Sequence, residues 1–137
     1  MTPVIYSWAV YKNMKPAELY ELFMDSALHT AATGSLAKIS RKVGGKWSAF
    51  EGMIYGKNLA LVPNRMIVQS WRSSAWKAGD PDSILVVQFE KSKSGGAIVE
   101  LAHIGVPHYD HKGVTQGWVE YYWKPWKEYL KGRKRRS

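Results

Sequence analysis

The sequence predicts an α+β domain in which a curved antiparallel sheet of about seven strands wraps one long C-terminal helix. Three observations predict this fold class. Between Gly113 and Lys131, the residues Trp118, Tyr122 and Trp126 are spaced four apart, so they share one face of a helix. From Leu36 to Val106 the hydrophobic period shortens to about two, which is typical of strands. A wide aromatic stripe must be covered by a large apolar surface, and a sheet bent around the helix provides one.

The N-terminal part of the chain predicts one strand followed by two short helices. Val4–Lys12 is rich in β-branched and aromatic residues, which favours a strand. Pro16 suits the first position of a helix, and an apolar face follows it. Asp25 or Ser26 can cap a second short helix, which we expect to end at Gly34.

The middle of the chain predicts six further strands in meander order, each bounded by turn residues. These strands are Leu36–Val43, Lys46–Met53, Ile54–Val62, Arg65–Ser73, Ile84–Lys91 and Ala97–Val106. Gly44-Gly45 is expected to form a two-residue hairpin turn, and Ser74–Ser83 a loop with an exposed Trp76. Gly52 and Gly56, isolated within predicted strands, indicate bulges or bends that allow the sheet to curve.

Pro125 interrupts the helical pattern of the C-terminal segment. A proline inside a helix removes one hydrogen bond and clashes with the carbonyl four residues back, here that of Tyr121. Either the helix kinks, or one helix ends near Tyr122 and another begins at Pro125. We expect a kink, because the aromatic spacing continues through the proline. A membrane-surface helix is the alternative for this segment, but no other face of the chain supports it.

The chain of 137 residues has a net charge of +9, from 20 basic and 11 acidic residues. Five basic residues belong to the C-terminal end: Lys131, Arg133, Lys134, Arg135 and Arg136. Without these five the net charge is about +4, so the body of the protein is mildly basic and indicates no specific nucleic-acid partner. We expect one domain over residues 1–131 and a disordered basic tail over 132–137, since Gly132 is a natural helix stop.

The chain contains no cysteine, which excludes disulfides, thiolate catalysis and cysteine metal sites. No segment approaches the ~18 consecutive apolar residues of a membrane span, and the N-terminal run does not have the form of a signal peptide. These features predict a cytoplasmic protein, which we expect to be a monomer or a weak dimer.

Four short motifs carry a family resemblance. They are Gly44-Gly45-Lys46-Trp47, the strand end Trp71-Arg72, His103 with Pro107 behind it, and Gly117-Trp118. With the sequence around them, from Ile5 to Leu130, they resemble the C-terminal domain of the activator of heat-shock-protein-90 ATPase and its single-domain relatives. That family belongs to the START-like (SRPBCC) superfamily, which shares the helix-grip fold of the birch-pollen allergen.

The resemblance implies a seven-stranded antiparallel sheet that grips the C-terminal helix, with two short helices after the first strand. It also implies a cavity between sheet and helix, which in many superfamily members holds an apolar small molecule, a lipid or a polyketide. In this chain we expect a ligand to contact Trp71, His103, Trp118, Tyr122, Trp47, Phe89, Leu101 and Trp126.

Two of the candidate positions leave alternatives open. His103 lies on the same face of its predicted strand as Val99 and Leu101, which we expect to point inward. It is therefore either a core histidine or a polar anchor for a ligand. Trp47 and Phe50 are three residues apart and cannot share one face of a strand without a bulge.

Catalytic and metal motifs are not found in the sequence. It has no Ser-His-Asp arrangement in a motif context, no G-x-S-x-G, no phosphate loop, and scattered carboxylates. His108-Tyr109-Asp110-His111 has ligand-like side chains but no second cluster, so we interpret it as a solvated turn before the helix. We therefore expect no catalytic residue, no metal and no cofactor.

These observations favour the non-catalytic binding of a small apolar or aromatic molecule in the cavity between sheet and helix. The first alternative is a co-chaperone that contacts a heat-shock ATPase through its surface, with a role in the stress response. The second is a cyclase-like enzyme acting on a hydrophobic substrate, for which the cavity would need a polar cluster.

Overall fold

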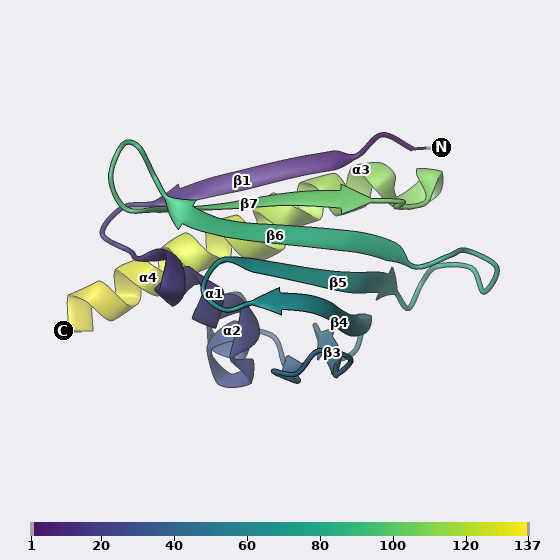
Figure 1. Cartoon of the computed structure of the whole chain (residues 1–137), viewed down its shortest axis with the longest axis horizontal. Helices are drawn as coiled ribbons and strands as arrows, with labels where there is room; N and C mark the ends of the chain where they lie inside the picture. The colour runs from purple at the N-terminus through teal and green to yellow at the C-terminus, as the bar shows by residue number, and fades with distance from the viewer. Residues whose placement is uncertain (1, 137) are drawn as a thin grey trace.

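A computed structural model describes residues 2–136 and shows a seven-stranded antiparallel sheet with a long C-terminal helix along one face (Figure 1). The elements are β1 (Ile5–Tyr11), α1 (Pro16–Met24), α2 (Ser26–Thr33), β2 (Lys38–Ile39), β3 (Lys46–Ala49), β4 (Ile54–Val62), β5 (Met66–Ser73), β6 (Ser83–Lys91), β7 (Ala97–Ile104), α3 (His108–Gly117), the π-helical segment η1 (Trp118–Trp123) and α4 (Lys124–Arg136). This order confirms the predicted fold class. No helix in the described part of the chain is long and apolar enough to cross a membrane.

The strands lie in the order β1-β7-β6-β5-β4-β3-β2, so the first strand of the chain pairs with the last. Every neighbouring pair is antiparallel. Alternate residues of β6 and β7 face the helix and are buried, as their period of two predicts. They are Leu85, Val87 and Phe89 on β6, and Val99, Leu101 and His103 on β7.

Helices α1 and α2 begin and end where the sequence predicts. Pro16 occupies the first turn of α1, where its missing N–H costs no hydrogen bond. Asp25 caps α2 by accepting a hydrogen bond from the Leu28 N–H at 2.9 Å. Gly34 ends α2 in the left-handed conformation, with φ of 81°.

The region before β4 differs from the prediction, because β2 and β3 are much shorter than the strands expected there. Gly44-Gly45 is not a two-residue hairpin turn but the end of a longer connection between the two strands. The side chain of Asn58 on β4 donates hydrogen bonds to the carbonyls of Ser40, at 2.7 Å, and Lys42, at 3.1 Å. These hydrogen bonds satisfy backbone carbonyls of the connection that a strand ladder would otherwise satisfy. A hydrophobic pattern of period two does not reveal such side-chain bonds.

The chain leaves β3 before Phe50, so Trp47 and Phe50 can both be directed inward without a bulge. Phe50 has φ of 53° and belongs to the turn after the strand, while Trp47 stays in the strand and is buried. Gly52 also lies in this turn. Gly56 lies within β4, where an added Cβ would be 1.9 Å from the Ser70 carbonyl oxygen, so the backbones approach too closely for a side chain. The register shift in β4 falls at Asn58 rather than at a glycine.

The C-terminal helix is continuous from His108 to Arg136 and contains one π-helical segment. The segment ends just before Pro125, and the Lys124 N–H bonds to the Val119 oxygen, five residues back. The helix therefore does not end near Tyr122. It also passes through Gly132, which was expected to stop it. That residues 132–137 form a tail separate from the domain stays a prediction; Ser137 lies outside the described residues.

Candidate functional site

Buried aromatic rings form a ladder along the inner face of the C-terminal helix. Trp118, Tyr122 and Trp126 are all buried, as their spacing predicts. The rings of Trp118 and Tyr122 lie 4.8 Å apart between centroids, and those of Tyr122 and Trp126 lie 6.3 Å apart. Trp126 also contacts Tyr11 and Phe23, so this end of the ladder is closed by side chains of β1 and α1.

His103 lies in the core, and both of its ring nitrogens are hydrogen-bonded. The Trp118 indole N–H donates to Nδ1 at 3.2 Å, so Nδ1 is unprotonated in this arrangement. Nε2 then carries the proton and donates to the Ser83 hydroxyl at 2.8 Å, which donates in turn to the Trp71 carbonyl at 2.7 Å. With both nitrogens engaged, His103 connects β7 to the C-terminal helix, β6 and β5.

His29 forms a second buried histidine network, which the sequence did not reveal. Its Nδ1–H donates to the Phe23 carbonyl at 2.9 Å, and its Nε2 accepts from the Tyr122 hydroxyl at 3.0 Å. Burial raises the pKa of Tyr122, which keeps that hydroxyl protonated. The interaction therefore holds α2 against the aromatic ladder of the helix.

Burial keeps both histidines neutral at physiological pH. Loss of contact with water lowers the pKa of His103 to about 3, with a smaller contribution from the positive charge of His111. It lowers the pKa of His29 to about 4, although the hydrogen bond to the Phe23 carbonyl acts in the opposite direction. Both rings can therefore serve as fixed hydrogen-bonding groups.

A cavity of about 360 Å³ opens at the N-terminal end of the ladder, between the start of the C-terminal helix and the β3–β4 turn. Three of the predicted ligand residues line it: Trp71, Trp118 and Tyr122. The other five, which are buried elsewhere in the core, do not: His103, Trp47, Phe89, Leu101 and Trp126. Phe50, whose orientation the sequence left open, completes much of the wall together with Met53 and Tyr121, which the sequence did not single out.

Apart from the aromatic side chains, the polar side chains that line this cavity are those of Ser73 and Asp110. Asp110 Oδ2 accepts a hydrogen bond from the Trp76 indole at 2.7 Å. The sequence predicted that Trp76 would be exposed in its loop. This prediction is wrong, because Trp76 is only 6% exposed and packs against Trp71. Asp110 itself lies in α3 rather than in a solvated turn. Two such groups are not the polar cluster that a cyclase-like reaction would need.

Two glycines of α3 line the same cavity, one helical turn apart. Gly117 has helical angles, with φ of −61° and ψ of −35°, so its backbone would accept another residue. A Cβ added there would meet the Tyr121 ring at 3.5 Å, an ordinary contact. At Gly113 a Cβ would be 3.1 Å from the Asp110 carboxylate. Glycine costs about 1 kcal/mol relative to alanine inside a helix, and here it leaves the cavity open.

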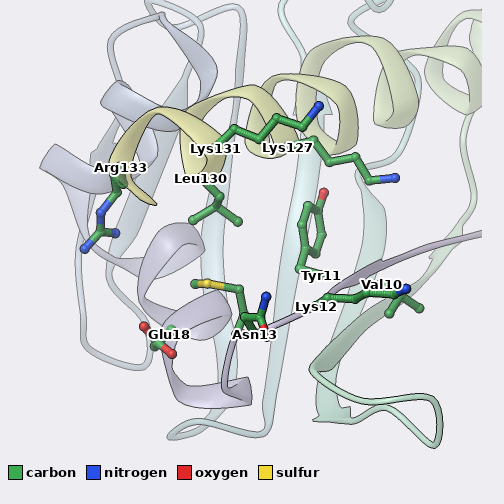
Figure 2. A pocket seen from close by; sticks show the side chains of 10 residues that line it. Val10, Tyr11, Lys12, Asn13, Glu18, Lys127, Leu130, Lys131 and Arg133 are labelled. Carbon is green, nitrogen blue, oxygen red and sulfur yellow. The ribbon is translucent and has the colours of Figure 1, made fainter. Parts of the chain in front are cut away.

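A second cavity, of about 780 Å³, lies at the other end of the helix, between α4, the end of β1 and the start of α1 (Figure 2). Its wall includes Tyr11 and Leu130 together with several charged side chains. It shares no residue with the first cavity. Within residues 2–136, no three His, Asp or Glu side chains gather as ligands for a metal ion.

A curved antiparallel sheet that grips a long C-terminal helix defines the helix-grip class of START-like proteins. Residues 13–131 match the model of the family described as Activator of Hsp90 ATPase homolog 1-like protein. The chain belongs to this family, as its motifs predict.

Among curated proteins, the chain is 30% identical to the human activator of 90 kDa heat shock protein ATPase homolog 1 over 109 residues. The match covers 80% of this chain and 32% of the human protein. A Dictyostelium discoideum homologue is 30% identical over 103 residues, which are 75% of this chain and 27% of that protein. The chain thus spans about a third of the length of the curated relatives it matches.

Solved structures confirm the fold. The crystal structure of an HSP90 activator from Plasmodium falciparum superposes with a TM-score of 0.82 at 26% identity, covering 94% of this chain and 96% of that one. A Mesorhizobium loti protein superposes with a TM-score of 0.77 at 15% identity, covering 94% and 97% of the two chains. The latter similarity concerns the fold alone.

Proposed function

We propose that this protein binds a small apolar or aromatic molecule, without chemistry of its own, in the cavity lined by Trp71, Trp118 and Tyr122. The observation that carries the proposal is the pair of glycines in α3 that keeps this cavity open. A volume of about 360 Å³ falls within the range of small-molecule sites, and the wall is mainly aromatic.

The chemistry of the wall indicates which ligand fits best. Trp71, Trp118 and Tyr122 are held by ring contacts and hydrogen bonds, so they form a rigid aromatic surface. Asp110 offers a carboxylate at the edge of the cavity, and its Oδ1 is not used by the Trp76 indole. An aromatic ring that carries one hydroxyl or amine donor satisfies both features, and naphthol is a simple probe of this kind.

Replacing Gly117 with leucine is expected to weaken naphthol binding at least about tenfold, a loss of roughly 1.4 kcal/mol, because the new side chain occupies the cavity. Binding is followed through the indole N–H signals of the protein in NMR spectra during titration. Gly132→Leu is the matched control: Gly132 lies in the same helix, an added Cβ meets nothing within 4 Å, and it lines neither cavity.

Both variants should gain helix stability to a similar extent, since leucine is a better helix former than glycine. Gly132→Leu should bind naphthol as the unmodified protein does. Equal binding by Gly117→Leu would place the ligand elsewhere. If neither naphthol nor a broad set of apolar compounds shifts the indole signals, the cavity does not serve as a binding site.

A second candidate function is contact with a heat-shock ATPase. It is favoured by the Plasmodium falciparum structure, because this chain covers 96% of a protein described as an HSP90 activator. Residues 1–137 span about a third of the curated activators, so by themselves they would lack any avidity that the rest of such a protein supplies.

Adding the protein to a purified Hsp90-type ATPase is therefore expected to raise ATP turnover less than about twofold. The measurement is the rate of phosphate release, corrected with a nucleotide-site inhibitor that removes the contribution of contaminating ATPases. Strong stimulation that survives moderate salt would make the chaperone contact the main function. A rate unchanged at saturating protein would remove this candidate.

A further inference from the structure

We propose that the second cavity, at the C-terminal end of the helix, binds a small amphipathic anion that has an apolar body and one carboxylate or phosphate head. This site is separate from the one under the β3–β4 turn, and the inference does not depend on the function proposed for that site. It follows from the floor of the cavity, from the charges on its rim, and from its size.

The floor of the cavity is apolar. Figure 2 shows Leu130 reaching from α4, and Tyr11 from β1, into the space between these two elements. The Tyr11 hydroxyl donates to the Trp123 carbonyl at 2.8 Å, so the phenol offers its ring rather than a free polar group. Met14 and Leu130 are partly buried against the core and extend this apolar surface. A ligand must therefore bring an apolar body to cover it.

The rim of the cavity is positively charged. Four cations line it, Lys12, Lys127, Lys131 and Arg133, against one carboxylate, that of Glu18. Glu18 accepts the Lys15 N–H at 3.0 Å at the start of α1, and its single negative charge leaves the four cations in excess. A group of like charges around an apolar floor favours a ligand of opposite charge.

Two of these cations are placed to hold the head of the ligand. Lys12 and Lys127 extend to the same side of the cavity in Figure 2, one from the end of β1 and the other from α4. Neither forms an ion pair with any residue that the structure describes, whereas Lys131 lies 3.8 Å from Glu128 and Arg133 covers the ring of Tyr129. An anion bound between Lys12 and Lys127 would be attracted by both charges.

The size of the cavity sets the scale of the ligand. A volume of about 780 Å³ lies in the upper part of the range for small-molecule sites and is about twice that of the first cavity. It accommodates a medium-length alkyl chain or a fused aromatic body, with the head at the lysine side. Decanoate, decanol and decylammonium share one chain and differ in charge, so together they test the head group.

In titration calorimetry below the micellar concentration, decanoate is expected to bind at least about tenfold more tightly than decanol, and decylammonium more weakly than either. The double variant Lys12→Gln, Lys127→Gln should weaken decanoate binding about fivefold to tenfold, as expected for two partly exposed charges. The control Lys57→Gln, Lys93→Gln removes the same charge from exposed lysines that line neither cavity, and it should bind decanoate unchanged.

Several results would overturn the proposal. Equal affinity for decanoate and decanol would show that the charges do not recognise the head. If both double variants weaken decanoate binding equally, the effect comes from the net charge of the protein and not from the two lysines of this cavity. Loss of decanoate binding in Gly117→Leu would assign the ligand to the first cavity. Binding to phosphatidylglycerol vesicles without binding to monomeric decanoate would identify a membrane surface, rather than a small anion, as the partner of this cavity.

Discussion

Replacing Trp118 with alanine is expected to lower the free energy of unfolding by about 3–5 kcal/mol, a large part of the stability of a domain of this size. Trp118 is 2% exposed, and its ring contacts those of Trp71, Tyr122 and Trp123. Its loss would leave a void beside an existing cavity and would also leave His103 Nδ1 without its donor.

Urea unfolding measures this effect, and Trp8→Ala is the matched control. Trp8 is 65% exposed on the outer face of β1, so its removal should change stability by less than about 0.5–1 kcal/mol. Trp118→Phe keeps most of the packing but loses the hydrogen bond to His103, and should fall between the two. Similar losses for Trp118→Ala and Trp8→Ala would show that the aromatic ladder does not hold the fold together.

Acidification is expected to destabilise the protein by several kcal/mol between about pH 6.5 and pH 3, because two histidines are buried in neutral form. An exposed histidine has a pKa of about 6.5, while burial lowers the pKa of His103 to about 3 and that of His29 to about 4. Below pH ~6.5 these two histidines therefore bind protons in the unfolded chain but remain unprotonated in the folded chain. The contribution of the two neutral histidines to the free energy of unfolding is fully present above pH ~6.5. It decreases as the pH is lowered, until the folded-state pKa of each histidine is reached.

Urea unfolding at a series of pH values measures this slope. In the double variant His29→Gln, His103→Gln the amides still donate and accept hydrogen bonds but do not titrate, so stability should depend less steeply on pH. The variant should be less stable than the unmodified protein at neutral pH, because the geometry of its hydrogen bonds is poorer. Parallel pH profiles for the two proteins would show that other groups, such as carboxylates, cause the acid sensitivity.

The elements that local pattern determines could be predicted from the sequence. β4 to β7 follow the period of two, and α1 and α2 follow their proline, aspartate and glycine signals. The connections were less predictable. The β2–β3 connection depends on the side chain of Asn58, and the turn after β3 depends on a left-handed Phe50. Neither a long-range amide contact nor a non-glycine residue with positive φ leaves a periodic signal.

The candidate site could be predicted only in part, for a related reason. Strand and helix parity indicates which side chains face inward, but it does not tell which of them border a void. Phe89 and Trp126 face inward and are packed on all sides, whereas Trp71 borders the cavity. Trp76 and His29 were not predicted as buried partners because Asp110 and Tyr122, which bond to them, are distant in sequence.

The pairing of β1 with β7 determines when this chain can fold. Ile5 lies opposite His103, so the strand that is made before every other described element obtains its neighbour only after β7 has been synthesised. The helix that covers the inner face of the sheet follows later still. Contacts this distant in sequence are formed late and slowly, because the loop between them must close first. Until β7 has been made, a growing chain therefore leaves the inward-facing Ile5, Ala9 and Tyr11 uncovered on an unpaired strand, where they can associate with other chains.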